Sequence, residues 1–326
     1  KRQAGAYQVA NSLRFRSSAS AYLSRTPGSA GNQQKFTWSG WVKRGSVSTD
    51  GYLFTTSATL NNNTNSFFLG FTSNSLNVFA YTSTTIANVT TSAVYRDPSA
   101  WYHIVLAVDT TQSTAANRFL LYVNGVQVTS FSSSTYPSQN TNLFVNNTQP
   151  HLIGAYSAAG YPSPLFDGYL ADINFIDGQA LSPTAFGKYS DTTGVWIPAS
   201  YTGTYGTNGF HLNFSNGTST TTLGYDSSGN SNNWTTNNIS LTAGSTYDWM
   251  LDSPTSFAGS SYGVGNYAVL NPINNLYFGG TISGGNLNLN YPASPSDSAG
   301  AASSIAIQSG TKVYFELVST TATYPL

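Results

Sequence analysis

The acidic side chains come first, because a pair of carboxylates is the usual machinery for cleaving glycosidic bonds. The chain of 326 residues contains a single Glu, Glu316, so a pair has to come from Asp. A retaining glycosidase needs two carboxyl groups about 5 Å apart. Asp172 and Asp177 are an odd number of residues apart, which places them on opposite faces of a strand. Asp167 and Asp177 share a face but lie too far apart at about 3.3 Å per residue. We therefore expect no hydrolysis by these residues.

The histidines and thiols offer no alternative chemistry. His103, His151 and His211 are isolated from one another in the sequence, and no G-x-S-x-G motif accompanies them. None forms the closely spaced pair that is typical of a zinc site. The chain has no Cys and only one Met, which excludes disulfides and thiol catalysis. We expect the histidines to be hydrogen-bonded sheet residues.

The charge balance excludes two classes of partner. Twelve basic and twelve acidic residues cancel, and only 7% of the chain is charged, against roughly 25% in a usual soluble domain. No basic surface is expected to attract nucleic acid or anionic lipid. No apolar run approaches the length of a membrane span, and no signal peptide is visible. The chain starts without Met, and we expect it to be a piece of a longer polypeptide.

The strongest element signal lies in residues 101–128. Ile104, Leu106 and Val108 alternate with their neighbours at the period of two that a packed strand requires. A second apolar run, residues 119–123, ends at Asn124-Gly125. Another short run, residues 126–128, follows directly. Because Asn-Gly accepts the positive φ angles of a type I′ turn, this segment predicts a β-hairpin.

Two further strands are expected to place their side chains by alternation. In residues 36–43, Phe36, Trp38 and Val42 share one face, and Trp41 faces the opposite way unless Gly40 marks a bulge. In residues 169–176, alternation divides the side chains into two sets of four. The first set is Tyr169, Ala171, Ile173 and Phe175, and the second is Leu170, Asp172, Asn174 and Ile176. A half-buried Asp in such a strand requires hydrogen-bond partners.

The remaining pattern is all-β. Residues 51–55, 66–72 and 75–81 form short strand-like runs that are separated by Asn- and Ser-rich turns. No stretch has a sustained helical period, and residues 182–187 predict a single turn that Pro183 begins. Short strands at this spacing favour an antiparallel sandwich over a parallel α/β fold.

Four segments together resemble a known family. Residues 101–109 (WYHIVLAVD), 119–128 (FLLYVNGVQV), 151–156 (HLIGAY) and 166–186 (FDGYLADINFIDGQALSPTAF) are similar in order to the laminin-G-like domain. Gly168 and Asp172 lie roughly where the G-x-x-D-x-x pattern of that domain expects them, with three residues between them instead of two, and Ile173 stands where an acidic residue usually follows. The resemblance covers about residues 13–189. It implies an all-β, concanavalin-type antiparallel β-sandwich (jelly roll).

The resemblance also suggests calcium, which laminin-G-like modules often bind at the rim of the sandwich. Ca²⁺ requires six to eight oxygen ligands. Asp109, Asn124, Asp167 and Asp177 lie at predicted strand ends, where such ligands can converge. The alternative, which we favour, is that Asp-Gly and Asn-Gly simply form turns. Calcium is the only cofactor that we consider.

Sugar recognition uses aromatic rings, amides and hydroxyls. The loops contain several aromatic residues among Gly, Ser, Thr and Asn, and this composition resembles that of adaptable binding loops. The candidate ligand-binding residues are Tyr156, Tyr161, Trp196, Tyr201 and Tyr205. With 22 Tyr in the chain, a structural role is the favoured alternative for each of them.

The rest of the chain resembles bacteriophage tail-fibre-like virion proteins, in which a laminin-G-like module precedes a SPRY-like β-sandwich. The segments that carry this resemblance are residues 210–214, 223–230, 233–234, 252–255 and 266–272, and residues 312–317 look like an early strand of the second module. We expect four parts. They are a lead-in (1–12), the jelly roll (13–190), a strand-rich extension that packs on the jelly roll or links it to the next module (191–250), and the start of an incomplete SPRY-like domain (251–326).

The resemblance implies a non-enzymatic phage fibre or appendage protein that is displayed outward on the virion. It would bind host-surface glycans, contact other virion proteins and form a trimer by analogy with fibres. The alternative is an assembly or decoration module on a capsid or tail without receptor binding. A glycan depolymerase is disfavoured by the carboxylates.

Overall fold

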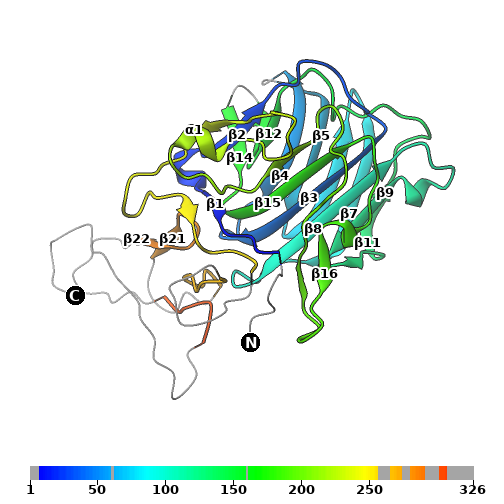
Figure 1. Cartoon of the computed structure of the whole chain (residues 1–326). Coiled ribbons are helices and arrows are strands. Elements are labelled where there is room, and N and C mark those ends of the chain that lie inside the picture. The colour runs from blue at the N-terminus through cyan, green and yellow to red at the C-terminus, as the bar shows by residue number, and fades with distance from the viewer. Residues whose placement is uncertain are drawn as a thin grey trace, which may run out of the picture.

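The structure is a computed structural model that describes residues 7–59, 62–158, 161–255, 265–273, 280–290 and 301–306. Two antiparallel sheets of eight strands each form a sandwich (Figure 1). This architecture confirms the expected all-β, concanavalin-type jelly roll. Among the described residues, no helix is long and apolar enough to span a membrane.

The first sheet, sheet A, has β3 and β15 at its centre. Its order is β10 (Val126–Gln127), β9 (Phe119–Val123), β8 (Trp101–Asp109), β3 (Lys35–Arg44), β15 (Gly168–Asp177), β1 (Ser12–Phe15) and β20 (Trp249–Met250), and β18 (Phe210–Leu212) also pairs with β15. The expected hairpin is confirmed, because Val123 pairs with Val126 across Asn124 and Gly125, whose φ angles are 49° and 81°. Positive φ at both positions is the requirement of a type I′ turn.

The second sheet, sheet B, is built from consecutive strands on one side. Its order is β11 (Phe131–Thr135), β7 (Thr85–Val94), β6 (Ser75–Tyr81), β5 (Asn62–Thr72), β4 (Gly51–Thr59), β12 (His151–Ile153), β2 (Tyr22–Arg25) and β19 (Thr235–Asn237). Three two-stranded hairpins flank the sandwich: β13 (Ala155–Ala158) with β14 (Tyr161–Leu165), β16 (Gly187–Tyr189) with β17 (Trp196–Pro198), and β21 (Thr281–Ser283) with β22 (Asn288–Asn290).

Within the described ranges, helical structure is limited to single turns. They are the α-helical turn α1 (Thr220–Leu223) and the 3₁₀ turns Ser17–Ala19, Ala115–Asn117 and Pro183–Ala185. The last of these confirms the turn that was expected after Ser182. Ser219 and Thr222 form a capping box at the start of α1, in which each side chain accepts the other's backbone N–H.

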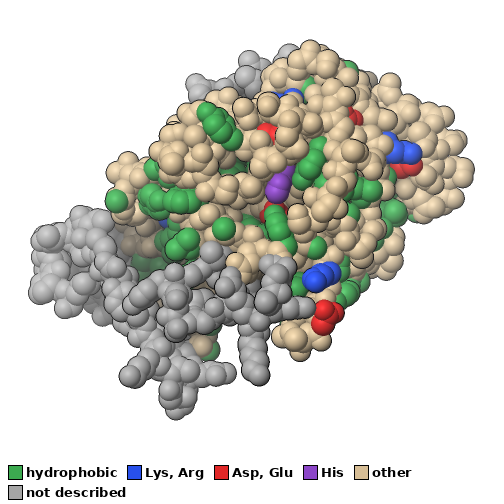
Figure 2. Space-filling model, in the orientation of Figure 1, with side chains coloured by type: hydrophobic (Ala, Val, Ile, Leu, Met, Phe, Trp, Pro, Cys, Tyr) green, Lys and Arg blue, Asp and Glu red, His purple; other side chains and the backbone are tan. Residues whose placement is uncertain are grey.

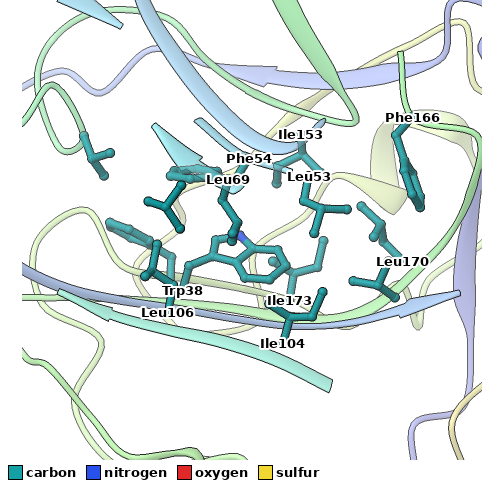
Figure 3. Close-up of a cluster of buried hydrophobic side chains, with 14 of the residues drawn as sticks. Trp38, Leu53, Phe54, Leu69, Ile104, Leu106, Ile153, Phe166, Leu170 and Ile173 are labelled. Carbon is teal, nitrogen blue, oxygen red and sulfur yellow. The ribbon is translucent and has the colours of Figure 1, made fainter. Parts of the chain in front are cut away.

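The main core lies between the two sheets. Trp38 of β3 is fully buried there and is surrounded by aliphatic side chains from both layers (Figure 3). Phe36 and Val42 belong to the same cluster, whereas Trp41 belongs to a separate cluster on the other side of sheet A. The alternation expected for this strand is therefore confirmed.

The alternation expected for residues 169–176 is wrong in its second half. Leu170, Ile173 and Phe175 face the core together, whereas Tyr169 and Ala171 face outward. The register between β15 and β3 shifts between Ala171 and Asn174, and Asp172 takes a positive φ of 49°. After this bulge, the side chains of the strand point to the opposite faces from those that a strict period of two predicts.

The segments after residue 190 contribute to the sandwich. Residues 191–250 supply β18, β19 and β20, and Phe210, Leu212 and Trp234 lie in the main core. Beyond residue 250, Lys43 Nζ of β3 donates to Asp252 Oδ2 at 2.7 Å, and Tyr169 donates to the carbonyl of Gly285 at 2.6 Å. Residues 312–317, which resemble a SPRY-like strand, and Glu316 lie outside the described residues.

Candidate functional site

The outward side of sheet B carries three rows of side chains in direct register. Their strand neighbours, such as Leu69 and Val78, point into the main core, so these rows point away from it. We call this surface the outer face of sheet B. Its rows are Tyr52, Gly70, Asn77, Thr90 and Ser133; Thr55, Phe68, Phe79, Asn88 and Thr135; and Ser57, Ser66, Tyr81 and Thr85.

Aromatic rings form a continuous series across this face. Tyr156 of β13 lies 5.3 Å from Tyr52, which lies 4.7 Å from Phe68, all measured between ring centroids. Phe68 stacks on Phe79 at 5.1 Å, and Phe79 is nearly parallel to Tyr81 at 6.2 Å. Centroid separations in this range are those of attractive ring pairs. The outer face therefore presents an extended aromatic track.

Gly70 of β5 leaves room for the Tyr52 ring of β4. A Cβ at this position would lie 2.8 Å from the carbonyl oxygen of Gly51 and 2.9 Å from a ring carbon of Tyr52. Without that atom, the Tyr52 ring lies across β5 and reaches Phe68. The lack of a side chain at Gly70 therefore provides the space that the Tyr52 ring occupies in the aromatic track.

Amides and hydroxyls lie beside the rings. Asn77 is buried, and its Nδ2 donates to Asn88 Oδ1 at 2.8 Å and to Thr90 Oγ1 at 2.6 Å. Ser133 of β11 donates to the carbonyl of Asn88 at 3.1 Å. The aromatic track and this polar network are neighbours because Phe79 pairs directly with Asn88.

The face carries no ionic groups. The whole stretch of residues 51–95, which includes β4 to β7, has no Asp, Glu, Lys, Arg or His. Asp50 lies just outside it and accepts the backbone N–H of Ser73. Burial, and secondarily Asp50, raises the pKa of Tyr52 to about 12, so its hydroxyl stays protonated at neutral pH. Figure 2 shows that uncharged side chains also dominate a view of the whole molecule.

A second polar cluster lies on the outward side of sheet A, at the bulge of β15. Asp172 Oδ1 receives the Tyr7 hydroxyl at 2.7 Å and lies 2.7 Å from His211 Nε2. Tyr205 donates to Asn174 Oδ1 at 2.8 Å, and its ring is nearly parallel to that of His211. Burial and the adjacent Asp172 raise the pKa values of Tyr7 and Tyr205. Asp172 thus has the partners that a buried carboxylate requires, and the cluster holds residue 7 against the sandwich.

The five candidate ligand-binding aromatics do not form one site. Tyr156 belongs to the aromatic track of sheet B, and the side chain of Tyr161 lies outside the described part of the chain. Trp196 is buried and donates from Nε1 to His103 Nδ1 at 2.9 Å. Tyr201 and Tyr205 pack against each other beside Phe186 on the sheet A side. Of the five, Tyr156 alone is shown to contact the outer face of sheet B.

The four candidate calcium ligands are also separated. Asp109 and Asp177 lie at one end of sheet A, because they pair with Lys35 and Phe36 at the start of β3. Asp167 and Asn124 lie toward the opposite end, since Gly168 pairs with Arg44 and Asn124 contacts His103. The structure therefore does not bring these four residues together, and Asn124-Gly125 forms a turn, as the favoured interpretation expects.

Protein donors already engage these carboxylates. Asp177 accepts backbone N–H groups from Asn32 and Asn208, and Asp167 accepts that of Gly285. Asp109 forms an ion pair with Lys35 at 3.1 Å. Within the described residues, no group of three or more His, Asp or Glu side chains is placed to share a metal ion. Each of these carboxylates therefore stabilises a turn or a strand end through its bonds to protein donors.

The residues that the sequence analysis missed are Phe79, Tyr81, Asn77 and Asn88. In β6 both faces are partly apolar, so alternation does not tell which side faces the core. The available signal was the run of 45 uncharged residues from 51 to 95, because a surface strand usually carries some charge.

Comparisons with known proteins find one family and several similar solved structures. No curated protein matches the chain by sequence. Similar solved structures include a putative carbohydrate binding protein from Bacteroides ovatus, with 14% identity, a TM-score of 0.40, and coverage of 71% of this chain and 59% of that one. A pentraxin from Limulus polyphemus has 16% identity and a TM-score of 0.37, covering 54% of this chain and 80% of that one.

A third similar structure is a sialidase module (CBM40) from Ruminococcus gnavus bound to sialyllactose. It has 12% identity and a TM-score of 0.33, with coverage of 51% of this chain and 85% of that one. At these identities the likeness concerns the fold alone. Residues 17–185, just over half of the sequence, match the family described as the concanavalin A-like lectin/glucanases superfamily, and the chain therefore belongs to that superfamily.

Proposed function

We propose that this protein is a non-enzymatic glycan-binding module that holds its ligand on the outer face of sheet B. The observation that carries the proposal is the aromatic track from Tyr156 to Tyr81, which runs beside the amides and hydroxyls of Asn77, Asn88 and Thr90. Sugar rings present C–H groups that pack on aromatic faces and hydroxyls that pair with amides. Membership of the concanavalin A-like lectin/glucanases superfamily supports the glycan-binding part of this proposal.

Binding without cleavage is favoured by the composition of the face. Glycoside hydrolysis by the usual route requires two carboxyl groups on either side of the scissile bond. Residues 51–95 contain no Asp or Glu, so the strands that carry most of the aromatic track supply neither an acid nor a nucleophile. A depolymerase acting on this face is therefore the weakest of the alternatives.

The setting that we propose is an outward-facing fibre or appendage of a bacteriophage virion, where the face would contact host-surface glycans. Its support is the resemblance of residues 210–214, 223–230 and 252–255 to tail-fibre-like proteins, together with the zero net charge. Trimeric assembly and contacts with other virion proteins belong to this proposal. The alternative is an assembly or decoration module whose face contacts a virion protein.

The test is a glycan array probed with the full chain, run in parallel with an assay for release of reducing ends. We expect binding to a subset of glycans, no release of reducing ends, and little change at high salt, since a neutral face gains little from ionic attraction. Absence of binding to every glycan, together with tight binding to virion proteins, would favour the assembly module. Release of reducing ends would establish the depolymerase.

A further inference from the structure

We propose that the half of the outer face formed by β6, β7 and β11 holds an uncharged pyranose ring, with Phe79 as its stacking platform and Asn88 Nδ2 as its hydrogen-bond donor. This inference rests on the proposed function and assigns the ligand class and the contacts within it.

The first step is the accessibility of the aromatic track. Tyr52, Phe68 and Tyr156 are 8–9% exposed, because the hairpin that begins with β13 packs over β4 and β5. Phe79 and Tyr81 are only partly buried. One face of the Phe79 ring is stacked on Phe68, at an interplanar angle of 23°. Because the Phe79 side chain is only partly buried, part of its ring remains accessible, and a flat apolar ligand surface can pack on it.

The second step is the orientation of two amides. Asn77 Nδ2 lies 3.3 Å from the carbonyl oxygen of Val89, which only accepts hydrogen bonds, so the NH₂ group of Asn77 must point toward β7. The same NH₂ group donates to Asn88 Oδ1, which also accepts the Thr90 hydroxyl at 3.1 Å. Asn88 Oδ1 is therefore the inner atom of its amide.

As a consequence, the NH₂ group of Asn88 points away from the network. Nδ2 of Asn88 has no hydrogen-bond partner among the residues that the structure describes, and the side chain is partly exposed. Asn88 pairs directly with Phe79, so the two N–H groups of its Nδ2 belong to the residue directly across from that ring. Asn77 is the positioning residue of this arrangement, since it fixes which end of the Asn88 amide faces outward.

The chemistry of the pair defines the ligand. A donor beside an aromatic ring suits the oxygen atoms of a sugar whose C–H face lies on the ring. An acid group on the sugar would need a cation, as carboxylates bound by proteins usually have one. Residues 51–95 offer none. The ligand is therefore an uncharged pyranose and not a sialylated or sulfated one.

The experiment measures binding of the full chain to immobilised lactose, maltotriose, cellotriose and mannotriose, and to sialyllactose as the charged counterpart of lactose. Phe79→Leu removes the ring and keeps an apolar side chain. Asn88→Asp replaces the free donor by an acceptor of the same shape. Tyr225→Ala is the matched control, because Tyr225 is an exposed aromatic residue, at 48%, outside this face. Thermal unfolding confirms that each variant is folded.

We expect wild type and Tyr225→Ala to bind at least one neutral glycan more tightly than sialyllactose. Phe79→Leu and Asn88→Asp should each weaken that binding about tenfold or more, the scale of one ring contact or one hydrogen bond. Unchanged binding in the two folded variants, or preference for sialyllactose, would overturn this inference and leave glycan binding in place. Failure of wild type to bind any of the five probes or any array glycan would instead overturn the proposed function, and this inference with it.

Discussion

At the scale of single residues, two buried histidines are locked in opposite neutral tautomers. His103 accepts the Trp196 indole N–H at Nδ1 and lies 2.9 Å from Ser39 Oγ at Nε2, so the proton is on Nε2. His151 accepts the backbone N–H of Asn146 at Nε2 and faces the carbonyl of Gln149 at Nδ1, so the proton is on Nδ1. Protonation of either ring would break the bond to its donor.

Because these two histidines are buried in neutral form, we expect the folded protein to lose stability in mild acid. Burial lowers the pKa of His103 to about 3 and that of His151 to about 4, from 6.5 in the unfolded chain. Below pH 6.5 the unfolded chain therefore binds protons that the native state does not, and stability falls as the pH falls toward those values. Each histidine contributes about 1.4 kcal/mol per pH unit. Denaturant unfolding should give a free energy about 4 kcal/mol lower at pH 5 than at pH 8.

The control is His103→Gln, which removes one of the two titrating groups. Its free energy of unfolding should depend on pH about half as steeply between pH 6.5 and 5. A wild-type stability that does not change over this interval would contradict the burial of neutral imidazoles at both positions.

At the scale of elements, the strands were more predictable than the faces that they present. The Asn124-Gly125 hairpin and the parity of β3 follow from local chemistry, and both were predicted correctly. The parity of β15 was not, because the bulge at Asp172 depends on contacts with Tyr7 and His211, which lie far away in the sequence. Nor does the sequence tell that Phe79 faces outward, since β6 is apolar on both sides.

The junction of β4 and β5 carries a prediction about Gly70. Gly70→Ala should lower the free energy of unfolding by about 1–3 kcal/mol, the usual cost of overpacking, because its Cβ meets both the Gly51 backbone and the Tyr52 ring. Displacement of that ring should also weaken glycan binding. Denaturant titration measures the first effect, and the array described above measures the second.

Gly28→Ala is the matched control for Gly70→Ala. A Cβ at Gly28 meets no atom within 4 Å, and the backbone there is not in the left-handed region. Its stability should change by at most about 0.5 kcal/mol, as at other surface positions. An equally stable Gly70→Ala protein would show that Tyr52 is not held against β5.

At the scale of the whole molecule, buried ion pairs connect the first strands to the last described segments. Asp248 is fully buried and receives Arg14 Nε at 3.1 Å and Arg16 Nε at 2.7 Å. Lys43 and Asp252 form a second buried pair, in which burial lowers the pKa of Lys43 and raises that of Asp252. The contacts with Asp248 satisfy Arg14 and Arg16, which alternate along the chain with the core residues Leu13 and Phe15.

Breaking the first of these connections should be costly. Asp248→Ala leaves two guanidinium groups buried without their carboxylate, and removal of one partner of a buried pair costs about 3–5 kcal/mol. Lys35→Ala is the comparison, because the Lys35–Asp109 pair lies near the surface and should contribute at most about 1 kcal/mol. Equal losses in the two variants, measured by denaturant unfolding, would contradict a special role for Asp248.

The same connections predict that the jelly roll does not fold as the fragment of residues 13–190. That fragment lacks β18, β19 and β20, and its core loses Phe210, Leu212 and Trp234. It also keeps Arg14 and Lys43 without their acidic partners. Loss of several large core side chains at a few kcal/mol each exceeds the usual stability of a domain. Calorimetry should therefore show no cooperative transition for the fragment and a sharp one for the full chain. A cooperative transition in the fragment would mean that the strands after residue 190 only cover a sandwich that is already complete.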